Sequence, residues 1–376
     1  GVYVYSETPA TDTQDGYDLL LTAYKFRRGD KVRATKVWSP LENPTPPADL
    51  MRGLRDPKVL KVVHHAAFDR VILSRLVYGY EDKYLDPREW RDTYAVAAYW
   101  GLPRSLDKLV TKFGIEGKLS EGQSLIRFFN NYSNRQLLVE ALNTEALSAE
   151  HLDEVFAERP ASLTAEGLSA VRARSGFGQA KKRLVAMADV VEKWNTYKAY
   201  NIHDVDILDE VNLLLPDMIP DEKRFWVLDQ EINDRGVLLD TGLAAACEAR
   251  MADIVADTRA ELIKLTGCPN PNSVMQIKDW VESKGVKVPA LRKEDVEKIL
   301  LRPTTPELVK VVLKKRKLIS ASSTAKYAAM RLRSSADGRA RGCFAYYGAH
   351  TGRAAGRGIQ LQNLPRIPDD AVPRIA

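Results

Sequence analysis

Short apolar runs separated by turn residues fill the start of the chain, and they predict β-strands. VYVY at 2–5, LLLTAYKF at 19–26 and KVRATKVW at 31–38 are rich in β-branched and aromatic residues. The turn residues Arg28-Gly29-Asp30 separate the last two runs. We therefore expect consecutive strands in a meander, which the proline-rich stretch ENPTPP at 42–47 brings to an end.

Apolar positions at helical spacing follow. Residues 59–77 pass from a short apolar strand into a helix, an αβ pattern. The less regular stretch 131–186 is interpreted as a helical insertion. Pro216 and Pro220 follow a strongly amphipathic segment, so a domain boundary is expected there, giving domains 1–216 and 217–376. Helices in the first domain are expected at 93–113, 122–130 and 190–215.

The second domain has a mainly helical pattern. A helix that Gly236 ends precedes the short strand VLLD, and strand character returns in GRARGCFAYYGAHTGR at 338–353. Together the two halves predict an α/β chain with a mostly helical second portion. Further helices are expected at 241–265, 272–284, 293–301 and 305–334.

Composition places the chain among globular proteins of two or three domains. Its 376 residues are 45% hydrophobic and 28% charged, without an apolar run long enough to cross a bilayer. Gly1-Val2 does not begin a signal peptide. The three cysteines form no CxxC pair and favour neither a disulfide framework nor a zinc site. A reducing, cytoplasmic location and a monomer without membrane contact are the expectations.

The net charge of +6 is concentrated near the end of the chain. Residues 301–376 hold fifteen Lys or Arg and four Asp or Glu, a balance of +11, which leaves −5 for residues 1–300. Such a basic region on an otherwise acidic chain favours a polyanion such as nucleic acid as the partner. Basic helix faces can also be merely solvated, so charge alone does not decide the function.

Three acidic motifs occur in order in the first domain. They are Tyr5-Ser6-Glu7-Thr8 after the opening strand, His65-Ala66-Ala67-Phe68-Asp69 where a strand becomes a helix, and Tyr200-Asn201-Ile202-His203-Asp204 on a late helix. This order resembles the DxE, NxxFD and YxxxD motifs of the 3′–5′ proofreading exonuclease of family A DNA polymerases. RDTYAVAAYWGLPRSLDKL at 91–109 and GQSLIRFF at 122–129 resemble the bacteriophage branch of that family.

The resemblance implies a two-metal site that hydrolyses a phosphodiester at a DNA 3′ end. Hard Mg²⁺ or Mn²⁺ ions prefer carboxylate oxygens. Glu7, Asp69 and Asp204 would be metal ligands, and Tyr200 would orient the attacking water. Tyr200 and Asp204 are four residues apart and share one helix face. Read without the family, Asp204 beside Asp206 and Asp209 could be ordinary solvated acidity, and His64, His65 and His203 are expected to be structural.

The first motif departs from the family pattern. Tyr5 stands where the family has the aspartate that bridges both metals. A phenol with an ordinary pKa near 10 stays neutral at working pH and cannot replace an anionic bridge. His65 replaces the asparagine of the second motif, which is not a metal ligand. We therefore expect the exonuclease fold with weak or no hydrolytic activity.

The stretch HTGRAAGRGIQLQNLPR at 350–366 resembles the segment before the first catalytic aspartate of family A polymerases. NPNSVMQIKDWVESKGVKVP at 270–289 resembles the tip of their thumb domain. The resemblance implies that Arg353 contacts the minor groove near the primer end and that Gln362 and Asn363 contact template and primer. The basic KKRK run could equally be a solvated helix face. The predicted DNA-binding residues are Lys314, Lys315, Arg316, Lys317, Ser323, Thr324, Lys326, Thr351, Arg353, Gln362, Asn363 and Arg366.

The resemblance covers nearly all of the chain, which is expected to end before the palm aspartates. It implies an RNase H-like exonuclease domain followed by a helical thumb and the first palm strands. The complete protein would be a DNA-dependent DNA polymerase that uses primer–template DNA, deoxynucleoside triphosphates and Mg²⁺ or Mn²⁺. The alternatives are an active 3′–5′ exonuclease and a non-catalytic DNA-binding module. A standalone ribonuclease would leave residues 221–376 unexplained.

Overall fold

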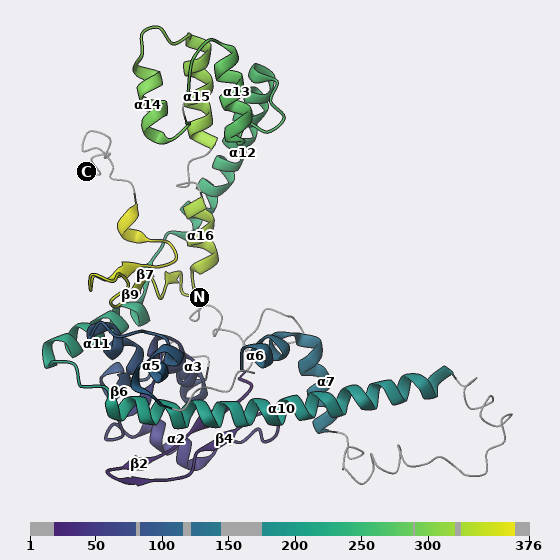
Figure 1. Ribbon diagram of the computed structural model, residues 1–376, viewed down its shortest axis with the longest axis vertical. Helices are drawn as coiled ribbons and strands as arrows, with labels where there is room; N and C mark the ends of the chain where they lie inside the picture. The colour runs from purple at the N-terminus through teal and green to yellow at the C-terminus, as the bar shows by residue number, and fades with distance from the viewer. Residues whose placement is uncertain are drawn as a thin grey trace. The chain divides into compact units, whose positions relative to one another are not determined.

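A computed structural model describes residues 19–79, 83–115, 122–143, 175–288, 290–319 and 325–364. These residues form two compact units. The first unit comprises the described residues up to Ile232 together with Tyr346–Ala355, and the second comprises Asn233–Ala345 and the described residues from Gly356 onward. Both are rich in helices, and their sheets are small (Figure 1). No described helix is long and apolar enough to cross a membrane.

The first unit begins with two antiparallel pairs. Strand β1 (Thr22–Tyr24) pairs with β4 (Lys36–Trp38), and the short hairpin of β2 (Arg27–Arg28) and β3 (Lys31–Val32) lies between them in sequence. Gly29 adopts a left-handed φ of 57° at the hairpin turn, a conformation that glycine tolerates without steric cost. The expected antiparallel strands are therefore confirmed in the described part, while the strand expected at 2–5 lies outside the described residues.

A parallel pair follows. Strand β5 (Lys61–Val63) pairs with β6 (Trp90–Asp92), and helix α3 (Ala66–Tyr78) lies in the connection between them. This confirms the αβ pattern at 59–77. Helix α2 (Ala48–Arg55) precedes β5, and the 3₁₀ turn η1 (Pro87–Glu89) precedes β6.

The helix expected at 93–113 is two helices, so that prediction was wrong. Helix α4 (Thr93–Tyr99) ends before Gly101, which has φ 64°, and α5 (Leu106–Phe113) begins after Pro103. A left-handed glycine followed by a proline breaks the α-helical hydrogen-bond pattern. Helices α6 (Gly122–Asn130) and α7 (Tyr132–Leu142) come next.

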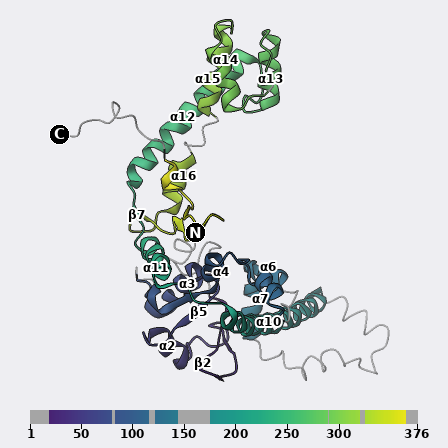
Figure 2. The same ribbon diagram turned by 60° about the vertical axis from the view of Figure 1, so that its left-hand side comes forward.

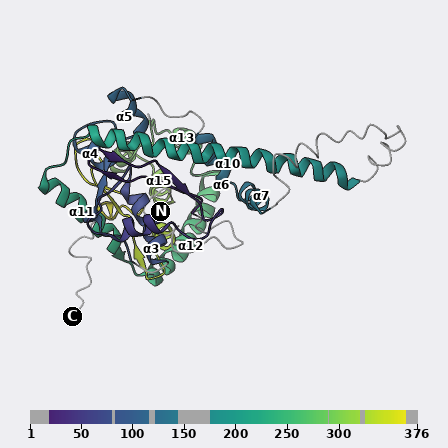
Figure 3. The same ribbon diagram turned by 90° about the horizontal axis from the view of Figure 1, so that it is seen from below.

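The long helix α10 (Ser175–Leu214) begins fifteen residues earlier than the expected start at 190. Viewed from below in Figure 3, it runs lengthwise beside α5, α6 and α7. Trp194 of α10 is fully buried, and its ring packs edge-on against Phe129 of α6. Val211, nearer the C-terminal end of α10, is buried against α5. α10 therefore supports two separate clusters of the core.

The second unit is built on α12 (Thr241–Thr266), which follows α11 (Pro220–Arg235) and the short strand β7 (Val237–Leu238). Figure 2 shows α16 lying along α12, with α13, α14 and α15 gathered at the far end of α12. The helix expected at 305–334 is helical at 307–319 and 325–333, and residues 320–324 lie outside the description. The remaining elements are α13 (Val274–Ser283), α14 (Lys293–Leu301), α15 (Glu307–Ile319), α16 (Ala325–Arg333), β8 (Arg339–Ala340), β9 (Phe344–Ala345), β10 (Ala355–Gly356) and η3 (Leu361–Asn363).

Candidate functional site

The parallel strands β5 and β6 end at one edge of the first unit, where a buried carboxylate lies. Asp92 ends β6 and is 6% exposed. Its Oδ1 accepts the N–H of His65 at 2.9 Å and the N–H of Tyr94 at 3.0 Å, and its Oδ2 accepts the N–H of Ala66 at 3.0 Å. One side chain therefore caps α4 and fixes the turn that leads into α3.

The sequence interpretation did not single out Asp92. The signal that could have found it is an Asp-Thr pair directly before an apolar helix, which is an N-cap pattern. Three backbone donors satisfy both of its oxygens, so its hydrogen bonds describe a structural role. Its negative charge nevertheless lies close enough to Asp69 to raise the pKa of the Asp69 carboxyl.

His65 occupies a strained position in this turn. Its φ of 97° is unusual for a residue other than glycine, and the bond from its N–H to Asp92 stabilises this conformation. The rings of His64 and His65 pack edge-on against Tyr94, with centroids 5.9 and 5.1 Å away. Nδ1 of His64 also lies 2.9 Å from Oγ1 of Thr93, whose hydroxyl donates to the carbonyl of Val63.

Asp69 lies one helical turn after His65, on the first turn of α3. Burial and, to a smaller extent, the negative charge of Asp92 together raise the pKa of the Asp69 carboxyl to about 7. The ionised form of Asp69 is therefore disfavoured when no cation is close to it. A divalent ion would stabilise that form, which makes this carboxyl suitable as a metal ligand.

Tyr200 and Asp204 both lie on α10, one turn apart. Tyr200 is 8% exposed, and Gly122 at the start of α6 packs against its ring. A Cβ atom at Gly122 would lie 2.1 Å from Cε2 of Tyr200, so no side chain fits there without displacing the ring. Asp204 is half-buried. The close packing of α6 fixes where the Tyr200 phenol can lie.

The neighbouring acids of α10 have a different role. Asp206 lies 2.8 Å from Nζ of Lys25, and Asp209 lies 3.2 Å from the same atom and 2.6 Å from Nη2 of Arg27. Thr35 also donates its hydroxyl to Asp206. These contacts tie α10 to the β1–β4 and β2–β3 strand segments, so Asp206 and Asp209 are structural ion-pair partners and not ordinary solvated acidity.

The structure thus places Asp69 beside Asp92, and Tyr200 with Asp204 on α10. Glu7 and Tyr5 lie outside the described residues. Among the residues that are described, no group of three or more His, Cys, Asp or Glu side chains is arranged to hold a metal ion. The three-carboxylate site therefore stays a prediction.

The KKRK run, residues 314–317, lies on α15, and several of its side chains contact other residues of the chain. Nζ of Lys315 lies 2.6 Å from Glu261 of α12, and Nζ of Lys317 lies 3.6 Å from Glu297 of α14. Arg316 donates to the carbonyl of Asn272 at 3.4 Å, and burial lowers its pKa. Lys314 is exposed and forms no ion pair within the described ranges. Two of the four cations therefore hold helices of the second unit together.

The LQN turn lies in the second unit. Gln362 and Asn363 are exposed, and the Asn363 carbonyl accepts a hydrogen bond from Nζ of Lys326 at 2.7 Å. The side chain of Gln362 covers Gly356 so closely that a Cβ there would lie 1.9 Å from Nε2 of Gln362. Gly356 therefore permits the close approach of the Gln362 side chain. Ser323, Thr324 and Arg366 lie outside the described residues.

The TGR turn, in contrast, lies in the first unit. Thr351 and Arg353 are both exposed there, so the guanidinium of Arg353 is accessible to a ligand. The stretch 350–366 is thus divided between the two units after Ala355. The contacts expected of Arg353, Gln362 and Asn363 with primer and template stay predictions.

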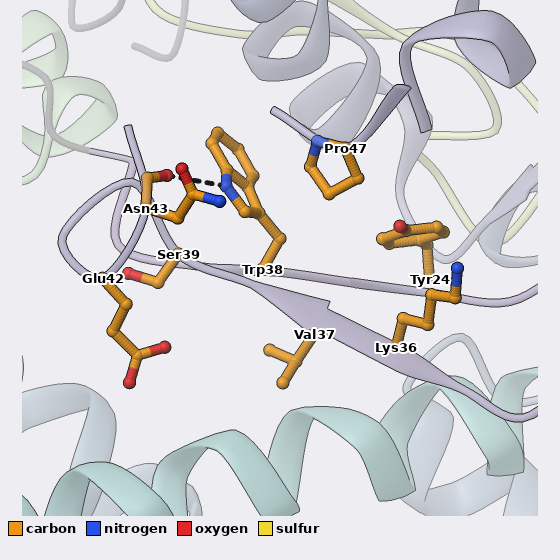
Figure 4. Close-up of a pocket in the computed structure, with 8 residues that line it drawn as sticks. All are labelled: Tyr24, Lys36, Val37, Trp38, Ser39, Glu42, Asn43 and Pro47. Carbon is orange, nitrogen blue, oxygen red and sulfur yellow. Dashed lines mark hydrogen bonds between the residues drawn. The ribbon is translucent and has the colours of Figure 1, made fainter. Parts of the chain in front are cut away.

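A cavity of about 470 Å³ lies elsewhere in the first unit, beside β4 (Figure 4). Trp38 lies against it, and its Nε1 donates to the carbonyl of Asn43 at 2.8 Å. None of the predicted site residues lines this cavity. The lining residues are Tyr24, Lys36, Val37, Trp38, Ser39, Glu42, Asn43 and Pro47.

The chain is similar to known proteins over most of its length. No family model matches it. The chain is 32% identical over 374 residues to a protein of Bacillus phage SP02 named DNA polymerase, a match that covers 97% of this chain and 49% of the relative. The chain therefore spans about half the length of the curated relative it matches.

A solved structure, the POL domain of Pol1 from M. smegmatis in complex with DNA primer-template and dNTP, is also similar. It is 15% identical with a TM-score of 0.48, and the match covers 90% of this chain and 48% of that one. This overall similarity is too weak to establish a shared fold. The identity to the phage protein is what confirms the predicted resemblance to a bacteriophage DNA polymerase along almost the whole chain.

Proposed function

We propose that this chain is part of a family A DNA polymerase that extends a primer on a DNA template during DNA replication. The observation that carries the proposal is the 32% identity to the phage DNA polymerase over 97% of this chain. In this proposal residues 1–216 form an RNase H-like exonuclease-type domain. Residues 217–376 form the thumb and the first palm strands. Deoxynucleoside triphosphates and the nucleotidyl transfer itself belong to the complete protein.

The contribution of this chain would be to hold primer–template DNA. Arg353, Gln362 and Asn363 are exposed, and residues 301–376 carry a balance of +11. Cationic side chains such as Lys314 would bind the phosphate backbone and give affinity without sequence preference. Arg353 would donate to the O2 and N3 acceptors that every correct base pair presents in the minor groove.

Salt dependence of DNA binding tests this proposal. The affinity of the chain for a labelled primer–template duplex is measured by fluorescence anisotropy between about 50 and about 200 mM NaCl. We expect log Kd to rise linearly with log salt, and Arg353→Ala to weaken binding at every salt concentration. Lys108→Ala, which removes the same charge from the exposed face of α5, is the control. An affinity that salt and Arg353→Ala both leave unchanged would contradict the proposal.

A second candidate function is 3′–5′ exonuclease activity. The observation that favours it is the position of Asp69 beside Asp92, at the edge where two parallel strands end. Asp69, with Asp204 and Glu7, would hold Mg²⁺ or Mn²⁺. Bound there, such ions supply charge stabilisation for the attacking and leaving oxygens. Tyr200 would hold the attacking water through its phenol. Tyr5 in place of an aspartate removes one anionic ligand, so we propose that the activity is weak or absent.

Degradation of a labelled single-stranded oligonucleotide with Mg²⁺ or Mn²⁺ tests this second candidate. Asp204→Ala is compared with Glu210→Ala, which alters an exposed carboxylate on the same helix. We expect at most slow cleavage. Rapid cleavage that Asp204→Ala and Asp69→Ala abolish, and Glu210→Ala leaves intact, would establish a fully active exonuclease and overturn the proposal of a weakened site.

A further inference from the structure

The turn that carries Arg353 is closed by hydrogen bonds on one residue, Ala349. The Ala349 N–H donates to the carbonyl of Arg353 at 3.1 Å, and the Ala349 carbonyl accepts the N–H of Gly352 at 3.2 Å. The same carbonyl accepts a second bond from Nη2 of Arg104, at 3.3 Å. Arg104 lies between α4 and α5, about 250 residues earlier in the chain, and both partners belong to the first unit.

The chain leading into the turn is anchored to the same unit. The hydroxyl of Tyr346 donates to Oε1 of Glu222 at 2.6 Å, and the Tyr346 ring packs against the buried cluster that contains Trp226. The Tyr347 ring meets Tyr99 of α4 edge-on, with centroids 6.1 Å apart. These contacts fix where the turn begins, and Arg104 fixes its middle.

Two residues of the turn adopt a left-handed backbone conformation. Tyr347 has a φ of 48° and Gly352 a φ of 81°, both in the left-handed region. A Cβ at Gly352 would lie 3.2 Å from Cε1 of Tyr347, so the ring lies close against the turn. Left-handed residues persist only where surrounding contacts hold them. An exposed turn of this kind depends on the few hydrogen bonds that reach it.

Arg104 is half-buried, and within the described part of the chain it forms no ion pair, which leaves its charge available for this bond. A guanidinium has five N–H donors, and a carbonyl oxygen accepts a bond from a charged donor more strongly than from a neutral one. The Ala349 carbonyl therefore has two donors, the Gly352 N–H within the turn and the Arg104 guanidinium from outside it.

We propose that Arg104 is a positioning residue for DNA binding: it holds the Ala349 carbonyl and thereby orients the turn that presents Arg353 to the primer end. Arg104 belongs to the exonuclease-type domain, whereas Arg353 belongs to the polymerase sequence. The first domain would thus contribute to primer–template binding without any nuclease chemistry. This inference rests on the proposed function, because it assigns Arg353 to the primer end.

A double-mutant cycle on the full chain tests the proposal. Kd for primer–template DNA is measured for the wild type, Arg104→Ala, Arg353→Ala and the double variant. Arg353→Ala should weaken binding about tenfold. Arg104→Ala should weaken it about threefold to fivefold, the range expected for losing one hydrogen bond of ordinary net strength. In the Arg353→Ala background, Arg104→Ala should have no further effect, because there is no guanidinium left to orient.

Two results would overturn the inference. One is an Arg104→Ala variant that binds as tightly as the wild type while Arg353→Ala binds more weakly. The other is an equal loss from Arg104→Ala in both backgrounds, which would mean that Arg104 acts independently of Arg353. Lys108→Ala controls for the loss of one charge, and thermal unfolding of each variant identifies any loss of folded protein. If Arg353→Ala itself has no effect on binding, the proposed function has failed at Arg353, a different outcome from either of these.

Discussion

At the residue scale, Lys223 places an ammonium group in the interior of the first unit, where burial disfavours its charge. Its Nζ donates to the carbonyl of Trp90 and lies 4.1 Å from the centroid of the Trp226 ring. Burial lowers the pKa of Lys223 from its ordinary value of 10.5 to about 8, although the charge of Asp92 acts in the opposite direction. The folded protein therefore releases this proton more readily than the unfolded chain does.

This difference predicts a pH dependence of stability. Between about pH 8 and 10.5 the unfolded chain binds more protons at Lys223, so the free energy of unfolding rises with pH across this window. Relative to Lys223→Met, the wild type should gain about 1–2 kcal/mol from about pH 7.5 to about pH 10, after allowance for solvent screening. Urea unfolding at both pH values measures it. Relative to Lys108→Met, which removes an exposed lysine and keeps Lys223, the wild type should show no such gain. An equal gain relative to both variants would contradict the assignment.

Single residues also show how far the sequence predicts the candidate site. Asp69, Tyr200 and Asp204 were predicted because each belongs to a local motif with its own spacing. Asp92 was not, because its role depends on pairing β6 with β5, which brings together residues 65 and 92. Arg104 escaped prediction for the same reason, since its partner Ala349 is distant in sequence. Contacts of this range leave no local pattern.

At the scale of elements, α10 shows why acidic residues that are adjacent in sequence differ in function. Asp206 and Asp209 face the cations Lys25 and Arg27, whereas Asp204 lies on the helix turn that carries Tyr200. Helical periodicity separates these groups by direction. The sequence predicted the helix but not its partners, because the strand segments that pair with it lie about 180 residues away.

The ion pairs of α10 predict a stability effect. Asp209→Asn should lower the free energy of unfolding by about 1–2 kcal/mol, because the Asp209 side chain is 13% exposed, Arg27 would lose this ion pair and Lys25 would keep only its pair with Asp206. Glu210→Gln alters the next residue, which is exposed and has no ion pair within the described ranges, and should change stability by less than about 0.5 kcal/mol. Urea unfolding of both variants tests this, and equal effects would rule out the docking role of Asp209.

Element boundaries were predicted less well than element types. The helix expected at 93–113 divides at Gly101 and Pro103, and α10 extends well before its predicted start. The first error came from reading apolar periodicity across two helix-breaking residues. The second came from a polar, alanine-rich segment around 175–189, whose periodicity is weak although its residues are compatible with a helix.

At the scale of the whole chain, the basic stretch 350–366 belongs to both units, which no local pattern indicated. Residues 346–355 leave the second unit, contribute Tyr346 to the core of the first, and end where Gly356 returns to the second. Under the proposed function, this connection would give the first unit a route to affect primer binding. Sequence similarity predicted the class of protein, whereas the division of this stretch required the structure.

The most direct test of the account is whether the chain distinguishes a primer end from plain duplex. Its affinity is measured at one salt concentration for a recessed primer–template and for a blunt duplex of the same length and charge. We expect the primer–template to bind at least about fivefold more tightly, and Arg353→Ala to remove most of that preference. Equal affinity of the wild type for both DNAs would contradict the claim that this chain holds the end of a primer.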